Sequence, residues 1–378
     1  MITATANAAT YFVDRHPEEG RGAKTAYREI GSGRVLTYDG LAQGAAQVAG
    51  AFAKAEIRAE ERAAMLVLDQ IEFPQIFWGA LKCGVVPIPL NTLLATSVYD
   101  AILRDARVSI LFVSAPLWDD VKGAVEGNPY LRHIVVIGGA TDGTTDYNDF
   151  IDGAVAKDTL PVSPDEVAFW LYSSGSTSQP KGVAHVHSAL RATSDTYGKQ
   201  VLEIEEDDVV FSAAKFFFAY GLGNAMTFPL SVGATTLLFG GRPTPDEMVK
   251  TLTAERPTIF CGVPTLYAAM VAHMDKSGPL DAPLRTCISA GEALPEEVGT
   301  RWERHTGCSI LDGVGSTEML HIFLSNRKDD LVYGTSGIAV PGYALRLVNE
   351  FGEEVGPGEV GELLVNGASS ASCYWNQR

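Results

Sequence analysis

Short apolar runs alternate with longer stretches of helical period along the first part of the chain. Strands are predicted at 63–68, 85–90, 108–113 and 133–137, and helices at 41–57, 71–83 and 97–106. Strands that alternate with helices are typical of a mostly parallel, doubly wound sheet. We therefore expect a first α/β lobe over residues 1–162, with a Gly-, Thr- and Asp-rich linker at 138–158.

The same alternation of predicted strands and helices continues over residues 163–336, which predicts a second α/β lobe. Strands are expected at 167–172, 209–213, 235–239, 258–262, 284–289 and 309–312, and helices at 245–255, 264–274 and 295–305. From residue 337 to 378 the pattern changes to two short strands, at 344–348 and 361–365, around a turn-rich segment. This pattern predicts a small antiparallel, β-barrel-like lobe.

Length and charge limit what the chain can do. A chain of 378 residues is long enough for two or three packed lobes, and its net charge of −17 argues against nucleic acid as a partner. The five cysteines form no C-x-x-C pair, so we expect reduced thiols and neither a disulfide frame nor a zinc site. No apolar segment is long enough to span a membrane, so we expect a soluble cytoplasmic protein.

A loop rich in hydroxyls and small residues follows the predicted strand 167–172. Its residues are Ser173, Ser174, Gly175, Ser176, Thr177, Ser178, Gln179, Pro180, Lys181 and Gly182. Backbone N–H groups, hydroxyls and a lysine together can hold a polyphosphate. The loop is not a Walker A motif, because Pro180 precedes the lysine and a glycine follows it. A flexible linker is the alternative, but the apolar run that resumes at residue 183 argues against it.

Two other loops follow predicted strands, at 289–295 and 312–318. Ligands of doubly wound sheets gather outside the carboxyl ends of the strands, so these loops and the hydroxyl-rich loop suggest one shared site. Glu318 suits Mg²⁺ on a triphosphate, and Thr317 suits an α-phosphate oxygen. The alternatives are a capped helix start at 316–318 and a plain strand-to-helix connection at 289–295.

Aromatic residues crowd the stretch 215–223. On a strand, alternating side chains cannot all face the core, so some of these aromatics are expected to line another surface. His321 has the alternative of a satisfied, partly buried histidine. His185 and His187 are spaced for one face of a strand, but with no third ligand nearby we favour His187 as a cap of the following helix over a metal pair.

The three loops resemble the motifs of the adenylate-forming enzymes, which include acyl-CoA synthetases, adenylation domains and luciferases. The first resembles [ST]SG[ST]TGxPKG with Ser178 in place of glycine, and 312–318 resembles YGxTE with Val314 in place of the aromatic. Many members carry a histidine where Phe218 stands. The strings FFAYGLGN at 217–224 and MLHIF at 319–323 resemble benzoate-CoA ligases.

This resemblance implies that a small aromatic acid, benzoate or a substituted benzoate, reacts with ATP and Mg²⁺ to give an acyl-adenylate, which coenzyme A then converts to a thioester. Lys181, Thr317 and Glu318 are the implied catalytic residues, with Glu318 on the metal. The implied nucleotide contacts are Ser173, Ser174, Gly175, Ser176, Thr177, Lys181, Ser289, Ala290, Gly291, Glu292, Ala293, Asp312, Gly313, Val314 and Thr317, Asp312 accepting from the adenine amino group. The implied acyl pocket, a short and shallow apolar slot, consists of Phe218, Ala219, Tyr220, Gly223, Gly291, Gly315, His321 and Ile322.

Two alternatives stay open beside the CoA ligase: an adenylation domain that serves a carrier protein, and a non-catalytic module that binds aryl acid and AMP. In the family, a C-terminal domain with an essential lysine follows the motif resembled by residues 374–376, and we expect that domain to be absent here. The chain is then expected to bind the acid and its adenylate yet turn over poorly. A homodimer is a further expectation.

Overall fold

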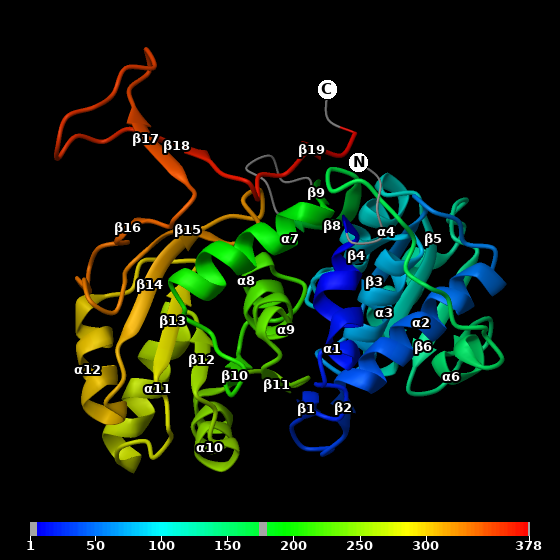
Figure 1. Cartoon of the computed structure of the whole chain (residues 1–378), viewed down its shortest axis with the longest axis horizontal. Coiled ribbons are helices and arrows are strands. Elements are labelled where there is room, and N and C mark those ends of the chain that lie inside the picture. The colour runs from blue at the N-terminus through cyan, green and yellow to red at the C-terminus, as the bar shows by residue number, and fades with distance from the viewer. Residues whose placement is uncertain (1–5, 174–179, 377–378) are drawn as a thin grey trace.

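Two α/β bodies lie side by side in the computed structural model, which describes residues 6–173 and 180–376 (Figure 1). The first is built on a five-stranded parallel sheet with the order β4-β3-β5-β6-β7. Its strands are β3 (Arg62–Leu66), β4 (Val86–Pro89), β5 (Val108–Ser114), β6 (His133–Ile137) and β7 (Thr145–Asp146). Its helices are α1 (Arg15–Glu18), α2 (Tyr38–Lys54), α3 (Glu72–Lys82), α4 (Thr96–Asp105), α5 (Trp118–Val125) and α6 (Tyr147–Ile151).

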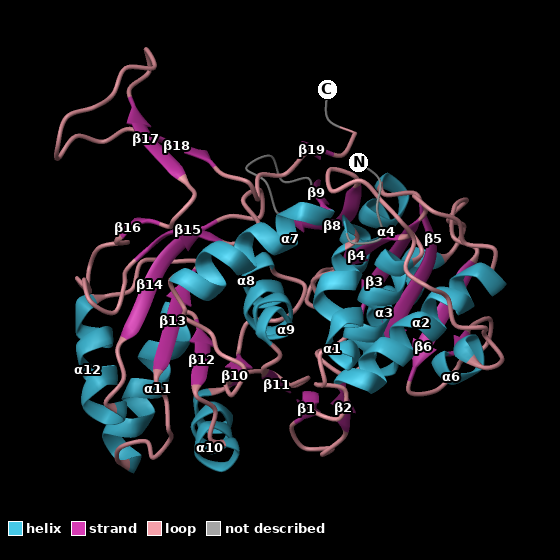
Figure 2. Cartoon of the chain, viewed as in Figure 1, coloured by secondary structure: helices cyan, strands magenta, loops and turns pink. Residues whose placement is uncertain are grey.

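The second body is built on a nine-stranded mixed sheet with the order β16-β15-β14-β13-β12-β10-β11-β1-β2. Its strands are β1 (Thr25–Glu29), β2 (Val35–Thr37), β10 (Val209–Ser212), β11 (Thr235–Leu238), β12 (Ile259–Gly262), β13 (Thr286–Ala290), β14 (Ile310–Gly315), β15 (Ile322–Ser325) and β16 (Ile338–Ala339). Its helices are α7 (His187–Thr193), α8 (Ala219–Leu222), the π-helix η5 (Gly223–Thr227), α9 (Phe228–Val232), α10 (Pro245–Glu255), α11 (Pro264–Ser277) and α12 (Glu296–Thr306). The six strands from β14 to β1 run parallel, which confirms the α/β class (Figure 2).

The sheets do not follow the sequence bounds of the predicted lobes everywhere. β1 and β2 belong to residues 1–162, yet β1 pairs with β11 of the second body, with Tyr27 opposite Thr236. The bounds 1–162, 163–336 and 337–378 stay a prediction. Through this pairing, the β1–β2 hairpin near the start of the chain becomes part of the nine-stranded sheet of the second body.

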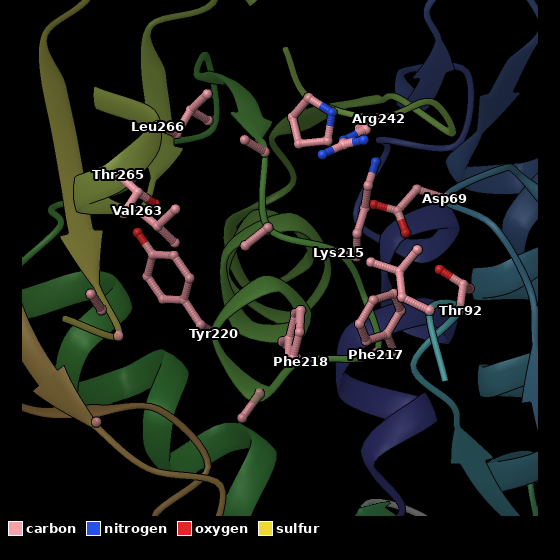
Figure 3. Close-up of a pocket in the computed structure, with 18 of the residues that line it drawn as sticks. Asp69, Thr92, Lys215, Phe217, Phe218, Tyr220, Arg242, Val263, Thr265 and Leu266 are labelled. Atoms are coloured by element: carbon pink, nitrogen blue, oxygen red, sulfur yellow. The ribbon is translucent and has the colours of Figure 1, made fainter. Parts of the chain in front are cut away.

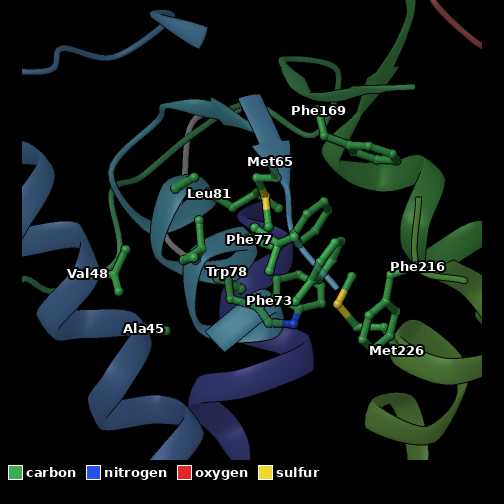
Figure 4. Close-up of a cluster of buried hydrophobic side chains, with 14 of the residues drawn as sticks. Ala45, Val48, Met65, Phe73, Phe77, Trp78, Leu81, Phe169, Phe216 and Met226 are labelled. Carbon is green, nitrogen blue, oxygen red and sulfur yellow. The ribbon is translucent and has the colours of Figure 1, made fainter. Parts of the chain in front are cut away.

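A single aromatic core joins the two bodies (Figure 4). The ring of Phe73 on α3 stacks on Phe216 with centroids 4.6 Å apart, and Phe77 meets Phe169 at 5.5 Å. All four side chains are fully buried. Because burying one phenylalanine stabilises a fold by roughly 1.5–3 kcal/mol, this shared core fixes how the bodies sit against each other.

The segment expected to be a linker is part of the first body. Asp146 caps α6, since its side chain accepts a hydrogen bond from the backbone N–H of Asn148, and Tyr147 and Phe150 are buried. Residues 138–158 are therefore anchored by two aromatic side chains, and the prediction of a linker is wrong over α6. All five cysteines are free thiols in the structure.

The last part of the chain forms no closed barrel in its described residues. β17 (Ala344–Val348) and β18 (Glu362–Asn366) pair only with each other, as an antiparallel hairpin that projects away from both bodies (Figure 1). β19 (Cys373–Tyr374) instead joins the hairpin of β8 (Val167–Ser173) and β9 (Lys181–Val186). The prediction of antiparallel strands is confirmed, but these strands belong to two different sheets, and neither sheet closes into a barrel in the described residues. Within 6–173 and 180–376, no helix has the length and apolar character to cross a membrane.

Candidate active site

A cavity of about 1050 Å³ lies at the carboxyl ends of the parallel strands of the nine-stranded sheet. Its lining includes residues just after β10, β11 and β12, and the last residues of β13 and β14, Ala290 and Gly315. The carboxyl edge of such a sheet is where loops from successive strands meet. Two of the three loops predicted to share a site, 289–295 and 312–318, contribute to this lining, whereas the part of the hydroxyl-rich loop that the structure describes does not, so one site shared by all three stays a prediction.

Most of the predicted acyl pocket lines this cavity. The lining contains Phe218, Ala219, Tyr220, Gly291, Gly315, His321 and Ile322. Gly223 is the exception, because it lies behind His321: a Cβ added there would stand 2.5 Å from the Cδ2 atom of His321. Its lack of a side chain makes room for the imidazole, so its predicted role as a lining residue is replaced by one in packing.

The aromatic run before α8 is a turn and not a strand. Phe216 and Phe217 are buried, whereas Phe218 is 50% exposed at the edge of the cavity. The argument from strand alternation was therefore wrong in its geometry. Its conclusion holds, because Phe217 and Phe218 line the cavity while Phe216 packs in the core (Figure 3).

Tyr220 and His321 form the buried end of the cavity. The Tyr220 hydroxyl donates to the carbonyls of Gly262 and Ile288, 3.0 Å from each, so the end of β12 and the middle of β13 hold its ring in place. The ring of His321 stacks beside Tyr220 at 5.7 Å and contacts Phe228 at 4.6 Å. Burial raises the pKa of Tyr220 well above 10, so its hydroxyl stays protonated.

His321 is a deeply buried, neutral imidazole in the wall of the cavity. It is 2% exposed, and in the described part of the chain neither ring nitrogen has a hydrogen-bond partner of ordinary length. Burial lowers its pKa to about 3, against a smaller opposing effect of the Tyr220 backbone. His321 is thus buried more deeply than the alternative of a partly buried histidine predicted. This end of the cavity is uncharged at neutral pH and suits an apolar ring.

The other end of the cavity is polar. Asp69, Lys215 and Arg242 line it (Figure 3). Lys215 donates from Nζ to the carbonyl of Phe239, and burial lowers the pKa of Lys215. Burial raises the pKa of Asp69 to about 6, although Lys215 nearby lowers it. The prediction of a shallow slot is wrong for the cavity as a whole, which extends from His321 to Arg242.

The hydroxyl-rich loop connects two paired strands. Ser173 at the end of β8 lies opposite Lys181 at the start of β9 in an antiparallel register, so the loop is closed at its base. The strands expected on either side are confirmed. The predicted contacts Ser174, Gly175, Ser176 and Thr177 fall outside the described residues, and their role stays a prediction.

A tight hairpin turn carries Thr317 and Glu318 between β14 and β15. The hydroxyl of Ser316 accepts from the backbone N–H of Met319 at 3.1 Å, and no helix follows, which excludes the capped helix start. β14 also extends beyond the predicted strand to Gly315. Added Cβ atoms at Gly313 and Gly315 would lie 2.7 Å from β15 or the turn before it, so glycine is required for this close pairing.

The structure brings the three predicted catalytic residues to one place. The carbonyl of Thr317 lies 2.9 Å from Nε2 of His185 on β9, the strand that begins at Lys181. Tyr374 then links the other two: its hydroxyl donates to Oε1 of Glu318 at 2.9 Å, and Nζ of Lys181 lies 5.5 Å from the centre of its ring. Sequence reasoning did not single out Tyr374.

The predicted adenine contacts lie on two neighbouring strands. Ser289 stands opposite Asp312 in the parallel pair of β13 and β14, and Oδ2 of Asp312 accepts from the backbone N–H of Leu294 at 3.3 Å. Oδ1 is buried with no partner among the described residues, and burial raises the pKa of this carboxyl. A buried free acceptor fits one donor of a ligand, such as the adenine amino group. Of the remaining predicted contacts, Ala290 is buried, Val314 is partly buried, and Glu292 and Ala293 are exposed.

Glu318 is the residue predicted to bind the metal, and this role stays a prediction. No group of three His, Cys, Asp or Glu side chains is placed to hold a metal in that part of the chain. A single carboxylate fits Mg²⁺ that arrives on a triphosphate, because such Mg²⁺ takes one or two protein carboxylates and keeps several waters. His185 and His187 form no pair, and Nδ1 of His187 accepts from the backbone N–H of Ala8 instead of capping α7, so that prediction is wrong.

The family model described as AMP-binding enzyme matches residues 13–375 of this chain. A benzoate–CoA ligase of Thauera aromatica is 48% identical over 375 residues, which cover 98% of this chain and 70% of that protein. A 4-hydroxybenzoate–CoA/benzoate–CoA ligase of Rhodopseudomonas palustris is 45% identical, with 98% and 69% covered. The chain thus spans about seven-tenths of the length of these relatives.

Solved structures give the same result. A benzoate CoA ligase from Burkholderia xenovorans LB400 superposes with a TM-score of 0.91 at 44% identity, covering 98% of this chain and 73% of that one. An anthranilate CoA ligase in complex with anthranoyl-AMP superposes with a TM-score of 0.93 at 36% identity, covering 99% and 73%. The motif resemblance is confirmed over nearly the whole chain, and the protein belongs to the family of AMP-binding enzymes.

Proposed function

We propose that this chain activates a small aromatic carboxylic acid, benzoate or a substituted benzoate, with ATP and passes the acyl group to coenzyme A. One observation carries the proposal. The neutral, aromatic end of the cavity at Tyr220 and His321 is continuous with Thr317, which lies beside Glu318 and the strand of Lys181. The relatives named for benzoate and hydroxybenzoate support the substrate class.

The acid binds with its ring against Tyr220 and His321 and its carboxylate toward Thr317. A charged carboxylate is too costly to bury beside a neutral imidazole, so the polar end of the molecule faces the loop and not the buried end. Aromatic walls favour a flat ring by contact area. The remaining volume of the cavity lies beyond Phe218, toward Arg242, and is left for the acyl acceptor.

In the first half-reaction the carboxylate oxygen attacks the α-phosphorus of ATP, and pyrophosphate leaves. Both reactants are anions, so fixed positive charge and donors near the phosphates lower the barrier. Lys181 supplies charge toward the departing phosphates, Thr317 donates toward the α-phosphate, and Asp312 accepts from adenine. Glu318 would hold Mg²⁺ that arrives on ATP, and the ion would supply further positive charge against the two anions.

In the second half-reaction the thiol of coenzyme A attacks the acyl carbon, and AMP leaves with the electrons of the broken acyl–phosphate bond. The acyl-adenylate is already activated, so this step depends chiefly on bringing the thiol to it. The end of the cavity that Lys215 and Arg242 line offers a cationic approach for a phosphorylated acceptor. Cytoplasmic location and a homodimer stay predictions.

Exchange of labelled pyrophosphate into ATP tests the proposal with benzoate, 4-hydroxybenzoate and octanoate as the acids. Selectivity between acids decides the result, because a ratio of exchange rates does not depend on the absolute rate of turnover. We expect exchange with the aromatic acids that exceeds exchange with octanoate at least tenfold. Equal exchange with octanoate, or none with any aromatic acid, would contradict the proposal. Thioester formation with free coenzyme A but not with a carrier protein identifies the acceptor.

A further inference from the structure

Residues 369–375, which we call the strap, cross the molecule between the turn that carries Glu318 and the strand that carries Lys181. At one end the hydroxyl of Ser369 donates to the carbonyl of Met319, and the backbone N–H of Ala371 donates to the carbonyl of Glu318, each at 2.7 Å. At the other end β19 pairs with β9, with Tyr374 opposite Val183. The strap therefore holds these two parts of the site together.

Trp375 fastens the strap to the first body. Its backbone N–H donates to the carbonyl of Gly182 at 2.7 Å, and its indole N–H donates to the carbonyl of Asp105 at 2.9 Å. Its ring also packs on Trp170 with centroids 4.6 Å apart. Cys373 pairs with Ala184 on the other side of Tyr374, so the position of the Tyr374 backbone is fixed by contacts that do not involve its own side chain.

Among the described residues, the side chain of Tyr374 has one hydrogen bond and one cation–π contact, and both are with predicted catalytic residues. Its hydroxyl donates to Oε1 of Glu318 at 2.9 Å, and the face of its ring lies 5.5 Å from Nζ of Lys181. The hydrogen bond occupies one carboxylate oxygen and leaves Oε2 for a cation. The ring holds the ammonium by a cation–π contact without neutralising its charge, as a carboxylate would.

We propose that Tyr374 is a positioning residue for the nucleotide: its hydroxyl orients Glu318 toward Mg²⁺ on the triphosphate, and its ring orients Lys181 toward the phosphates. This inference rests on the proposed function, since it assigns those roles to Glu318 and Lys181. A phenylalanine would preserve the ring contact and lose the hydrogen bond. A leucine would lose both, so the two contacts can be tested separately.

The test compares Tyr374→Phe and Tyr374→Leu with Tyr130→Phe, which removes a phenol hydroxyl from a residue of similar exposure, 43% against 40%. Calorimetry measures the affinity for ATP with Mg²⁺, for ATP with EDTA, and for AMP. Melting curves confirm that each variant is folded. A role in strand packing alone would change melting but would leave the three affinities in the same proportion to one another.

We expect Tyr374→Phe to weaken binding of MgATP about fivefold while ATP in EDTA and AMP bind within about twofold of the parent. Tyr374→Leu should also weaken the binding of ATP in EDTA, because Lys181 loses its cation–π contact with the ring. Tyr130→Phe should change none of the three affinities. Unchanged MgATP affinity in both Tyr374 variants would overturn the inference and leave the proposed function intact. Absence of any ATP or AMP binding by the parent chain would overturn both.

Discussion

The substitution Gly223→Ala tests whether His321 is a fixed wall of the acid pocket. Gly223 stands at the junction of α8 and η5 with φ −62°, a conformation that alanine adopts without strain. The effect of the methyl group therefore comes only from its contacts. It would lie 2.5 Å from Cδ2 and 3.0 Å from Nε2 of His321, and 3.0 Å from Cζ of Phe228.

The imidazole of His321 can move away from the added methyl group in one direction. Tyr197 and Phe228, both fully buried, contact it at 4.8 and 4.6 Å, so the open direction is into the cavity that it lines. An ordinary carbon contact is about 3.5–4.0 Å, so the ring has to retreat by about 1 Å. Overpacking of this kind costs roughly 1–3 kcal/mol of unfolding free energy. The same shift narrows the space for the aromatic ring of the acid.

We expect Gly223→Ala to lower kcat/KM for benzoate ten- to a hundredfold, since a displacement of about 1 Å next to a bound ring has effects of that size. KM for ATP should stay within about twofold. The assay is pyrophosphate exchange with benzoate varied at saturating ATP, together with a melting curve. The matched control is Gly123→Ala on α5, where the added Cβ meets only Cγ2 of Thr96 at 3.4 Å. If the Gly223 variant keeps both its benzoate kinetics and its melting temperature, His321 is not held as described.

Three further predictions concern nucleotide binding and the effect of buried titratable side chains on stability. Lys181→Ala should weaken ATP and pyrophosphate binding about tenfold or more in calorimetry and leave benzoate binding within twofold; an equal loss for both ligands would remove Lys181 from the phosphates. Asp312→Asn should narrow the preference for ATP over ITP, which lacks the amino group; an unchanged ratio of affinities would separate Asp312 from adenine. The unfolding free energy should fall as the pH drops from 7 to 5, because the pKa values of His321 and His185 are lowered in the fold to about 3 and 4, whereas the unfolded imidazoles protonate near the ordinary 6.5. Each contributes about 2 kcal/mol to this loss at pH 5, and Asp69, with its pKa raised to about 6, opposes it by less; denaturant titrations that show equal stability at both pH values would contradict this.

The sequence predicts the elements of this fold well wherever local pattern decides. The run 133–137 is β6, as its apolar pattern predicts. The stretch 245–255 is α10, which begins at Pro245 and is capped by the side chain of Thr244. The lining residues near Tyr220 and His321 were found through their motif and not through periodicity.

What the sequence did not predict depends on contacts between distant parts of the chain. The pairing of β1 with β11, the anchoring of residues 138–158 by Tyr147 and Phe150, and the open pairing of β17 with β18 all depend on which surface a segment meets. Tyr374 was missed for the same reason, because 56 residues separate it from Glu318. Asp69 and Lys215 carry no motif, and only the folded chain places them on one cavity.

The central claim is that an aromatic-lined pocket and a nucleotide site form one continuous binding site. The affinity of a non-hydrolysable benzoyl-AMP analogue, measured by calorimetry beside AMP and benzoate alone, tests it most directly. Joining two ligands that occupy adjacent parts of one site raises affinity by orders of magnitude over either part. We predict that the analogue binds at least a hundredfold more tightly than AMP, and that Gly223→Ala removes most of this gain. An analogue that binds no more tightly than AMP would contradict the account, since the ring would then lie outside the cavity of Tyr220 and His321.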